Sequence, residues 1–109
     1  MDKNEVNKGI NMDSLDEIKA DILGMMEEGR LRDLFKQNIN FVKLEFKSGV
    51  DFPILYLEFP NQSFSCLSTE IIDEFWEIST IVLRVKPILN IKYLGEKPLT
   101  IIYCDDEQQ

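Results

Sequence analysis

The sequence predicts an α+β protein in which an antiparallel β-sheet of four to five strands carries two helices packed on one face. Three observations support this fold class. Apolar residues recur every three or four positions from Ser14 to about residue 37, they alternate with charged residues after Ile39, and two apolar runs flank a polar loop at Gly95 near the end of the chain. The predicted element order is α-β-β-(β)-α-β-β, which suits helices covering one side of a sheet.

The first helix is predicted to begin at Ser14. The Ser14 hydroxyl can cap the amides of a first turn, and Glu17 stands three residues later, as in a capping box. One helical stripe then contains Leu15, Ile18, Ile22, Met25 and Met26. Leu31, Leu34 and Phe35 continue the helical spacing, so we expect the helix to end near residue 37, with Gly29 either bending or ending it.

A β-hairpin is predicted to follow. Apolar and charged residues alternate in its first strand, with Val42, Leu44 and Phe46 against Lys43, Glu45 and Lys47. Residues 48–51 have turn composition, and residues 54–59 form the second strand. A short third strand is expected from Ser63 to Leu67, with Phe64 and Cys66 on one face.

A second helix is predicted from Ser68 or Thr69 to about residue 85, before Pro87. Its apolar stripe consists of Ile71, Phe75, Ile78, Val82 and Val85. Residues 80–86 also fit a strand with Ile81 in the core, but a strand there would leave almost no loop before the next one. The continuous helix makes Ile81 solvent-facing. A final hairpin is expected to join residues 88–94 to residues 99–104.

Length and composition indicate one domain, at residues 13–104. The chain has 109 residues, of which 44% are apolar, enough for one modest core. Residues 1–12 are polar and are expected to form a flexible tail, and residues 105–109 an acidic C-terminal tail. We expect a cytoplasmic protein, because residues 1–12 lack the apolar run of a signal peptide and no stretch is apolar enough to span a membrane.

The composition argues against enzyme activity, a cofactor or a metal site. The chain has no histidine, which is the commonest general base and transition-metal ligand. Cys66 and Cys104 lie far apart with no other thiol near them, so we interpret both as reduced core residues. The single-glycine turns at Gly49 and Gly95 have no phosphate-binding pattern. A net charge of −8 argues against direct nucleic-acid binding.

The most distinctive candidate site is an acidic stripe on the second helix, formed by Glu70, Asp73, Glu74 and Glu77. These four residues fall within an arc of about 100° at 100° per residue, and no Lys or Arg follows until Arg84. Like charges at this spacing destabilise a helix slightly, so the stripe is a candidate docking face for a basic partner. The simpler interpretation is a solvated helix face with acids near its positive end.

Trp76 lies beside the acidic stripe, at the edge of the apolar one. A half-exposed tryptophan suits either a protein interface or the edge of a core. We include Trp76 with the four acids among the predicted partner-binding residues.

These features favour a small, acidic, non-catalytic protein-binding protein that acts as an inhibitor, an immunity protein or antitoxin, or a viral antagonist. Electrostatic complementarity would give such a protein fast, salt-sensitive association with a basic partner.

A further class of function, a small-ligand-binding domain, would need a shared pocket, for which Tyr56, Tyr93 and Tyr103 are candidates.

The alternative is an acidic secretion or assembly chaperone acting as a homodimer. In its element order alone (helix, three strands, helix, two strands) the chain resembles class I type III secretion chaperones. The final helix of that family has no counterpart after Cys104. Dimerisation through an apolar helix face would favour this alternative over the inhibitor.

Overall fold

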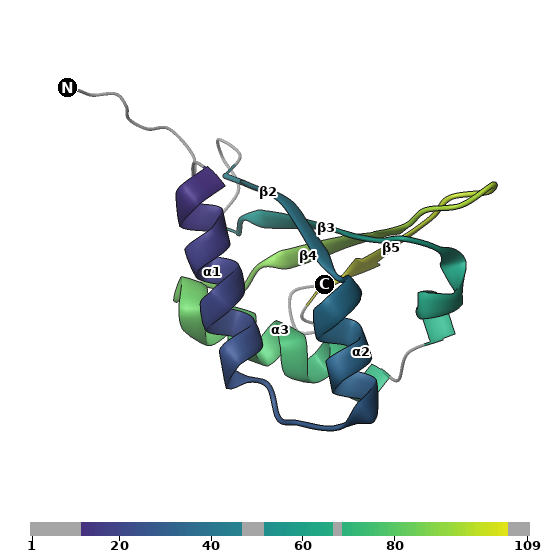
Figure 1. Ribbon diagram of the computed structural model, residues 1–109. Helices are drawn as coiled ribbons and strands as arrows, with labels where there is room; N and C mark the ends of the chain where they lie inside the picture. The colour runs from purple at the N-terminus through teal and green to yellow at the C-terminus, as the bar shows by residue number, and fades with distance from the viewer. Residues whose placement is uncertain (1–11, 47–51, 67–68, 105–109) are drawn as a thin grey trace.

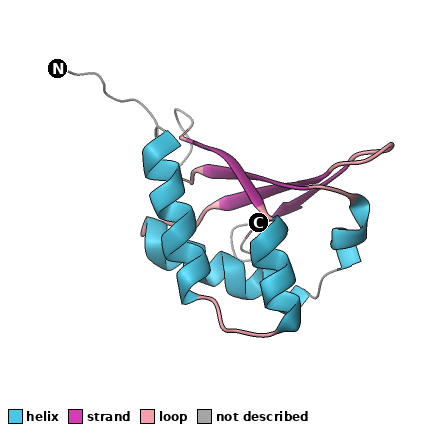
Figure 2. Ribbon diagram, viewed as in Figure 1, coloured by secondary structure: helices cyan, strands magenta, loops and turns pink. Residues whose placement is uncertain are grey.

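The computed structural model describes residues 12–46, 52–66 and 69–104 (Figure 1). In chain order its elements are α1 (Met12–Met25), α2 (Arg30–Asn38), β2 (Asn40–Glu45), β3 (Ile54–Phe59), the 3-10 helix η1 (Gln62–Cys66), α3 (Thr69–Leu83), β4 (Ile88–Tyr93) and β5 (Leu99–Tyr103). The α+β class is confirmed, with the helices gathered on one side of a four-stranded sheet (Figure 2). The predicted tails, apart from Met12, and the turn at 48–51 lie outside the described residues.

The sheet has the strand order β2-β3-β4-β5 and is mixed, so the prediction of an antiparallel sheet is wrong at its centre. β2–β3 and β4–β5 are antiparallel as expected, but β3 and β4 are parallel, with Ile54 opposite Ile88. The 15-residue α3 is about 22 Å long and the six-residue β3 about 20 Å. The helix therefore returns the chain to the end of the sheet where β3 starts, and the Ile88 amide donates a hydrogen bond to the Pro53 carbonyl (2.9 Å).

The predicted first helix is two helices, which raises the number of helices from two to three. α1 begins at Met12, two residues before the predicted cap Ser14, and ends at Met25, and α2 begins at Arg30. Met26 and Phe35 are both buried, although on one continuous helix nine residues would separate them by about 900°, placing them on opposite sides. The break lets both side chains reach the same core.

β2 departs from the predicted alternation because it contains a β-bulge. The register shifts between Phe41 and Lys43, which leaves Val42 as the extra residue. Phe41 and Leu44 are consequently the residues that face the core, whereas Val42 and Phe46 are exposed.

The third strand predicted for residues 63–67 does not form, because residues 62–66 are the 3-10 helix η1. Its first turn is held by the Ser63 amide, which donates to the Asn61 carboxamide oxygen (3.0 Å). The two-helix start and η1 both depart from the element order on which the resemblance to secretion chaperones was based.

α3 ends at Leu83 rather than at residue 85. Arg84 adopts the left-handed conformation (φ 63°), and its amide donates to the Thr80 carbonyl (2.8 Å), which is a common way for a helix to end. Residues 80–83 are helical, so the alternative strand at 80–86 is excluded and Ile81 is solvent-facing, as predicted.

We expect Ile81→Glu to change the free energy of unfolding by less than about 1 kcal/mol, because surface substitutions rarely exceed this. The side chain is 61% exposed, so the carboxylate stays in water. Urea denaturation of both proteins measures the difference. A loss of several kcal/mol would mean that Ile81 is buried in solution.

The core lies between the helices and the inner face of the sheet. Its centre is aromatic: the ring centroids of Phe35 lie 5.3 Å from those of both Phe59 and Phe75, and Phe41 lies 5.8 Å from Phe75. These rings come from β2, β3 and two helices, so the cluster joins the layers. The buried side of α3 fixes which side of that helix faces solvent.

Candidate docking face on α3

Three of the predicted site residues share the solvent side of α3. Ile71, Phe75 and Ile78 face the core, and the opposite arc carries Glu70, Asp73 and Glu77, all exposed. Ile81 follows Glu77 by one turn and falls on the same arc at about 100° per residue. We call these four residues, Glu70, Asp73, Glu77 and Ile81, the α3 face.

Glu74 lies at one flank of this arc and is engaged inside the protein. One carboxylate oxygen accepts a hydrogen bond from Arg32 Nε on α2 (2.6 Å) and the other from the Glu27 amide (2.9 Å). The side chains of Arg32 and Glu74 are only 24% and 19% exposed. Glu74 therefore ties the turn between α1 and α2 to α3.

Electrostatics reinforce the contact of Glu74 with Arg32 and the Glu27 amide, which we call the Glu74 clamp. Burial by itself raises the pKa of Glu74, but the hydrogen bonds from Glu27 and Arg32 and the positive charges of Arg32 and Lys36 outweigh it, so the pKa is lowered. The same hydrogen bond raises the pKa of Arg32. Lys36 also donates to the Met26 carbonyl (3.3 Å), which satisfies a group left over at the end of α1.

The Glu74 clamp places a positive charge beside a stripe that the sequence predicted to be entirely acidic. The sequence around Glu74 contains no cation, yet the fold brings Arg32 beside it from 42 residues away. Arg32 also draws Glu27 to this surface (3.9 Å), a residue that sequence reasoning did not include. Spacing along the chain gave no signal for either contact. Among the described residues, Asp73 and Glu77 have no ion pair.

Trp76 lies on the other flank of α3, toward β5. Its indole N–H donates to the Pro87 carbonyl (2.8 Å), and its ring lies 6.3 Å from that of Tyr103. The side chain is half-buried and packs against the core. Trp76 thus joins the middle of α3 to Pro87, just before β4, and to β5.

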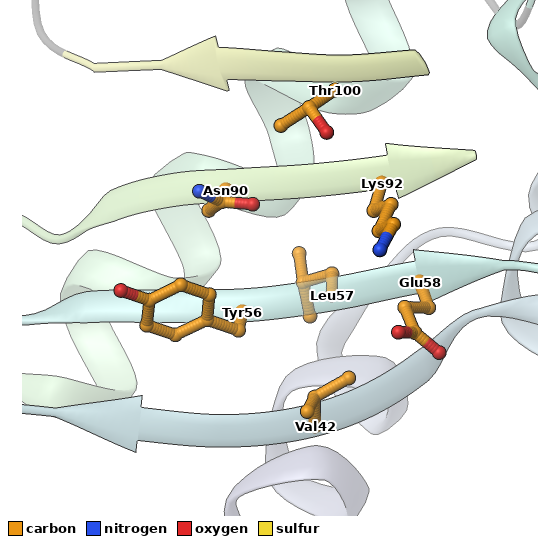
Figure 3. Close-up of a pocket in the computed structure, with 7 residues that line it drawn as sticks. All are labelled: Val42, Tyr56, Leu57, Glu58, Asn90, Lys92 and Thr100. Carbon is orange, nitrogen blue, oxygen red and sulfur yellow. The ribbon is translucent and has the colours of Figure 1, made fainter. Parts of the chain in front are cut away.

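The outward face of the sheet, on the side without helices, contains a shallow depression of about 320 Å³. Figure 3 shows Tyr56, Glu58, Asn90, Lys92 and Thr100 around it. Tyr56 donates to Glu45 (2.7 Å), which raises its pKa, and Lys43 lies over its ring (4.7 Å). Lys43, Asn90 and Lys92 therefore all lie on this outward face.

The three tyrosines do not line one pocket. Tyr56 borders the outward depression, whereas Tyr93 is buried on the helix side and Tyr103 pairs in register with Leu89 on that side. In the described parts of the chain, no group of three acidic or sulfur-bearing side chains is arranged to hold a metal. Cys104 is a half-buried free cysteine. No described helix is both long and apolar enough to cross a membrane.

The site must be interpreted from its own geometry. Comparisons of the chain with protein-family models, with curated proteins and with solved structures found no match.

Proposed function

We propose that this chain is a non-catalytic binding protein, of the inhibitor, immunity or antitoxin, or viral-antagonist type, and that its α3 face docks onto a basic surface of another protein. The observation that carries the proposal is the composition of this face. Three exposed acids lie along the solvent side of α3, and an isoleucine that is 61% exposed follows them one turn after Glu77.

The acids and the isoleucine would have separate roles in such a contact. Exposed carboxylates steer a basic partner toward the face and raise the association rate. Ile81 would contribute to affinity because binding would remove its exposed apolar surface from water. The helix dipole favours Glu70, which lies in the first turn of α3. Asp73 and Glu77 are four residues apart beyond that turn and repel each other slightly, so helix stability does not account for their placement.

Glu74 and Trp76 support the face from its flanks. Both use their polar atoms within the protein, so we leave them out of the proposed contact. We choose Glu70, Asp73, Glu77 and Ile81 because their side chains are exposed on one side of α3. The Glu74 clamp and the packed Trp76 hold α3 in place, and a rigid face loses less entropy on binding.

Affinity capture from the native host, with the partner identified by mass spectrometry, tests this function. The triple variant Glu70→Lys, Asp73→Lys, Glu77→Lys is expected to lose the captured partner and to keep its fold by circular dichroism. A matched control reverses three exposed acids of α1, namely Asp16, Glu17 and Asp21. The control undergoes the same change in net charge and is expected to retain binding, apart from a modest loss of long-range attraction.

Salt dependence provides a second measurement. Association of the wild type with the identified partner should slow as salt rises to about 0.1 M and above, because exposed charges are screened beyond roughly 10 Å. If the α3 variant and its control bind equally well, the partner contacts another surface.

A further inference from the structure

We propose that the free edge of β5 is a homodimer interface, at which β5 of a second copy of this chain adds in antiparallel register centred on Ile101. This proposal does not depend on the function of the α3 face. The dimer would join two four-stranded sheets into one eight-stranded sheet.

Among the described strands, β5 is the last in the sheet order, so alternate amide and carbonyl groups point away from β4. Its sequence, Leu-Thr-Ile-Ile-Tyr, contains no charge, proline or glycine. Three of its side chains are unusually exposed for their type: Leu99 (42%), Ile101 (39%) and Ile102 (58%). An uncharged, apolar edge strand of this kind readily pairs with another strand.

The opposite edge of the sheet is protected. β2 contains the bulge at Val42 and carries Lys43 and Glu45. Bulges and charges are the devices by which proteins prevent unwanted strand pairing at an edge. β5 has neither device, so the two edges of the sheet differ in what they permit.

The helix layer covers β5 only in part. Leu99 and Ile101 lie opposite the buried residues Tyr93 and Ile91, which places them on the helix side of the sheet. They nevertheless remain about two-fifths exposed, and the α3 contact at this strand is made by Trp76 with Tyr103. Figure 1 shows the β4–β5 hairpin extending away from the helices. A neighbouring strand would cover this exposed apolar surface.

A second copy fits this edge because the side-chain pattern of β5 is self-complementary. With Ile101 on the two-fold axis, Ile101 faces its own copy, Leu99 faces Tyr103, and Thr100 faces Ile102. These are apolar, aromatic and β-branched pairs, which stabilise adjacent strands. A two-fold contact requires such a self-matching surface.

Pairing through β5 also closes the assembly. The resulting eight-stranded sheet would have β2 at both ends, and both of these edges are bulged and charged. No unprotected edge would remain to add further copies. The α3 face stays accessible, because the Trp76 flank of α3 lies toward β5 and the Glu74 flank lies toward α2.

Sedimentation equilibrium over a range of protein concentrations tests the proposal. The wild type is expected to show a reversible monomer–dimer equilibrium. Ile101→Lys should be monomeric, because two lysines would face each other across the axis. The matched control is Ile81→Lys, which makes the same change at an exposed isoleucine outside β5 and should dimerise like the wild type.

Mixing variants tests the register itself. Ile101→Lys and Ile101→Glu should each be monomeric alone, and a mixture of the two should form a mixed dimer because opposite charges then meet at the axis. Circular dichroism verifies that each variant is folded. If neither folds, hydrogen exchange of wild-type amides 99–103 replaces the mixing experiment, and their protection should rise with protein concentration.

Three results would overturn the proposal: a wild type that stays monomeric at every concentration, a dimer that survives Ile101→Lys, or concentration-independent exchange in β5. Salt separates this proposal from the one for the α3 face. Dimerisation of an acidic chain through an apolar edge should persist or strengthen as salt rises, whereas binding of a basic partner to the α3 face should weaken. Either proposal can therefore fail without the other.

Discussion

Phe75→Ala is expected to lower the free energy of unfolding by about 3–5 kcal/mol, the usual range for removing a buried aromatic ring. Phe75 is fully buried, and its ring lies 5.3 Å from that of Phe35 and 5.8 Å from that of Phe41. The substitution would leave a cavity at the point where α3, α2 and β2 meet. Single domains are stable by only about 5–15 kcal/mol, so the variant should be close to unfolding.

Urea denaturation followed by far-ultraviolet circular dichroism measures this loss. Phe46→Ala is the matched control, because Phe46 is exposed after the end of β2. This substitution should lower the free energy of unfolding by less than about 1 kcal/mol. Phe75→Leu keeps much of the side-chain volume, so its loss in the free energy of unfolding should lie between those of Phe75→Ala and Phe46→Ala. Equal effects of Phe75→Ala and Phe46→Ala would contradict the aromatic core described above.

Glu74→Gln is expected to lower the free energy of unfolding by about 1–3 kcal/mol at neutral pH, the range for losing hydrogen bonds to a charged group. The variant keeps the side-chain shape but loses the charge, and its NH2 group replaces one of the two oxygens that accept from Arg32 and from the Glu27 amide. The turn between α1 and α2 should become less protected from hydrogen exchange. Glu77→Gln, one turn away and exposed, is the control and should have little effect.

The pH dependence of this difference follows from the lowered pKa of Glu74. A carboxyl group whose pKa is lower in the folded state stabilises the fold above its unfolded pKa, which is about 4.3 for glutamate. This contribution disappears as pH falls through the lower, folded-state pKa. The gap between wild type and Glu74→Gln should therefore be full at neutral pH and shrink in acid. A gap that is constant across this range would mean that the Glu74 charge contributes nothing to stability.

The two proposed surfaces lie on different elements: one is the solvent side of α3 and the other is the edge of β5. Ile81→Lys should weaken partner binding without changing the oligomeric state, and Ile101→Lys should do the reverse. Trp76 lies between these surfaces and contributes to the packing of both α3 and β5.

The sequence alone determined the features that depend on local periodicity. The α+β class, the helix through Ile81 and the antiparallel pairing of the last two strands follow from apolar spacings of three to four or of two. The acidic arc of Glu70, Asp73 and Glu77 is also local, because it needs only the rotation of a helix. Each of these features involves residues close in the chain.

Tertiary structure decided the rest. Met26 and Phe35 both enter the core only if the helix breaks between them, and β4 joins β3 in parallel because α3 spans the sheet and returns the chain to its start. The bulge at Val42 reversed the expected facing of that residue, and the fold placed Arg32 against Glu74, a contact of which the sequence gives no sign. These outcomes depend on contacts between residues far apart in sequence. Such contacts override the local conformational preferences of the residues, and they produce no periodic pattern in the sequence from which they could be predicted.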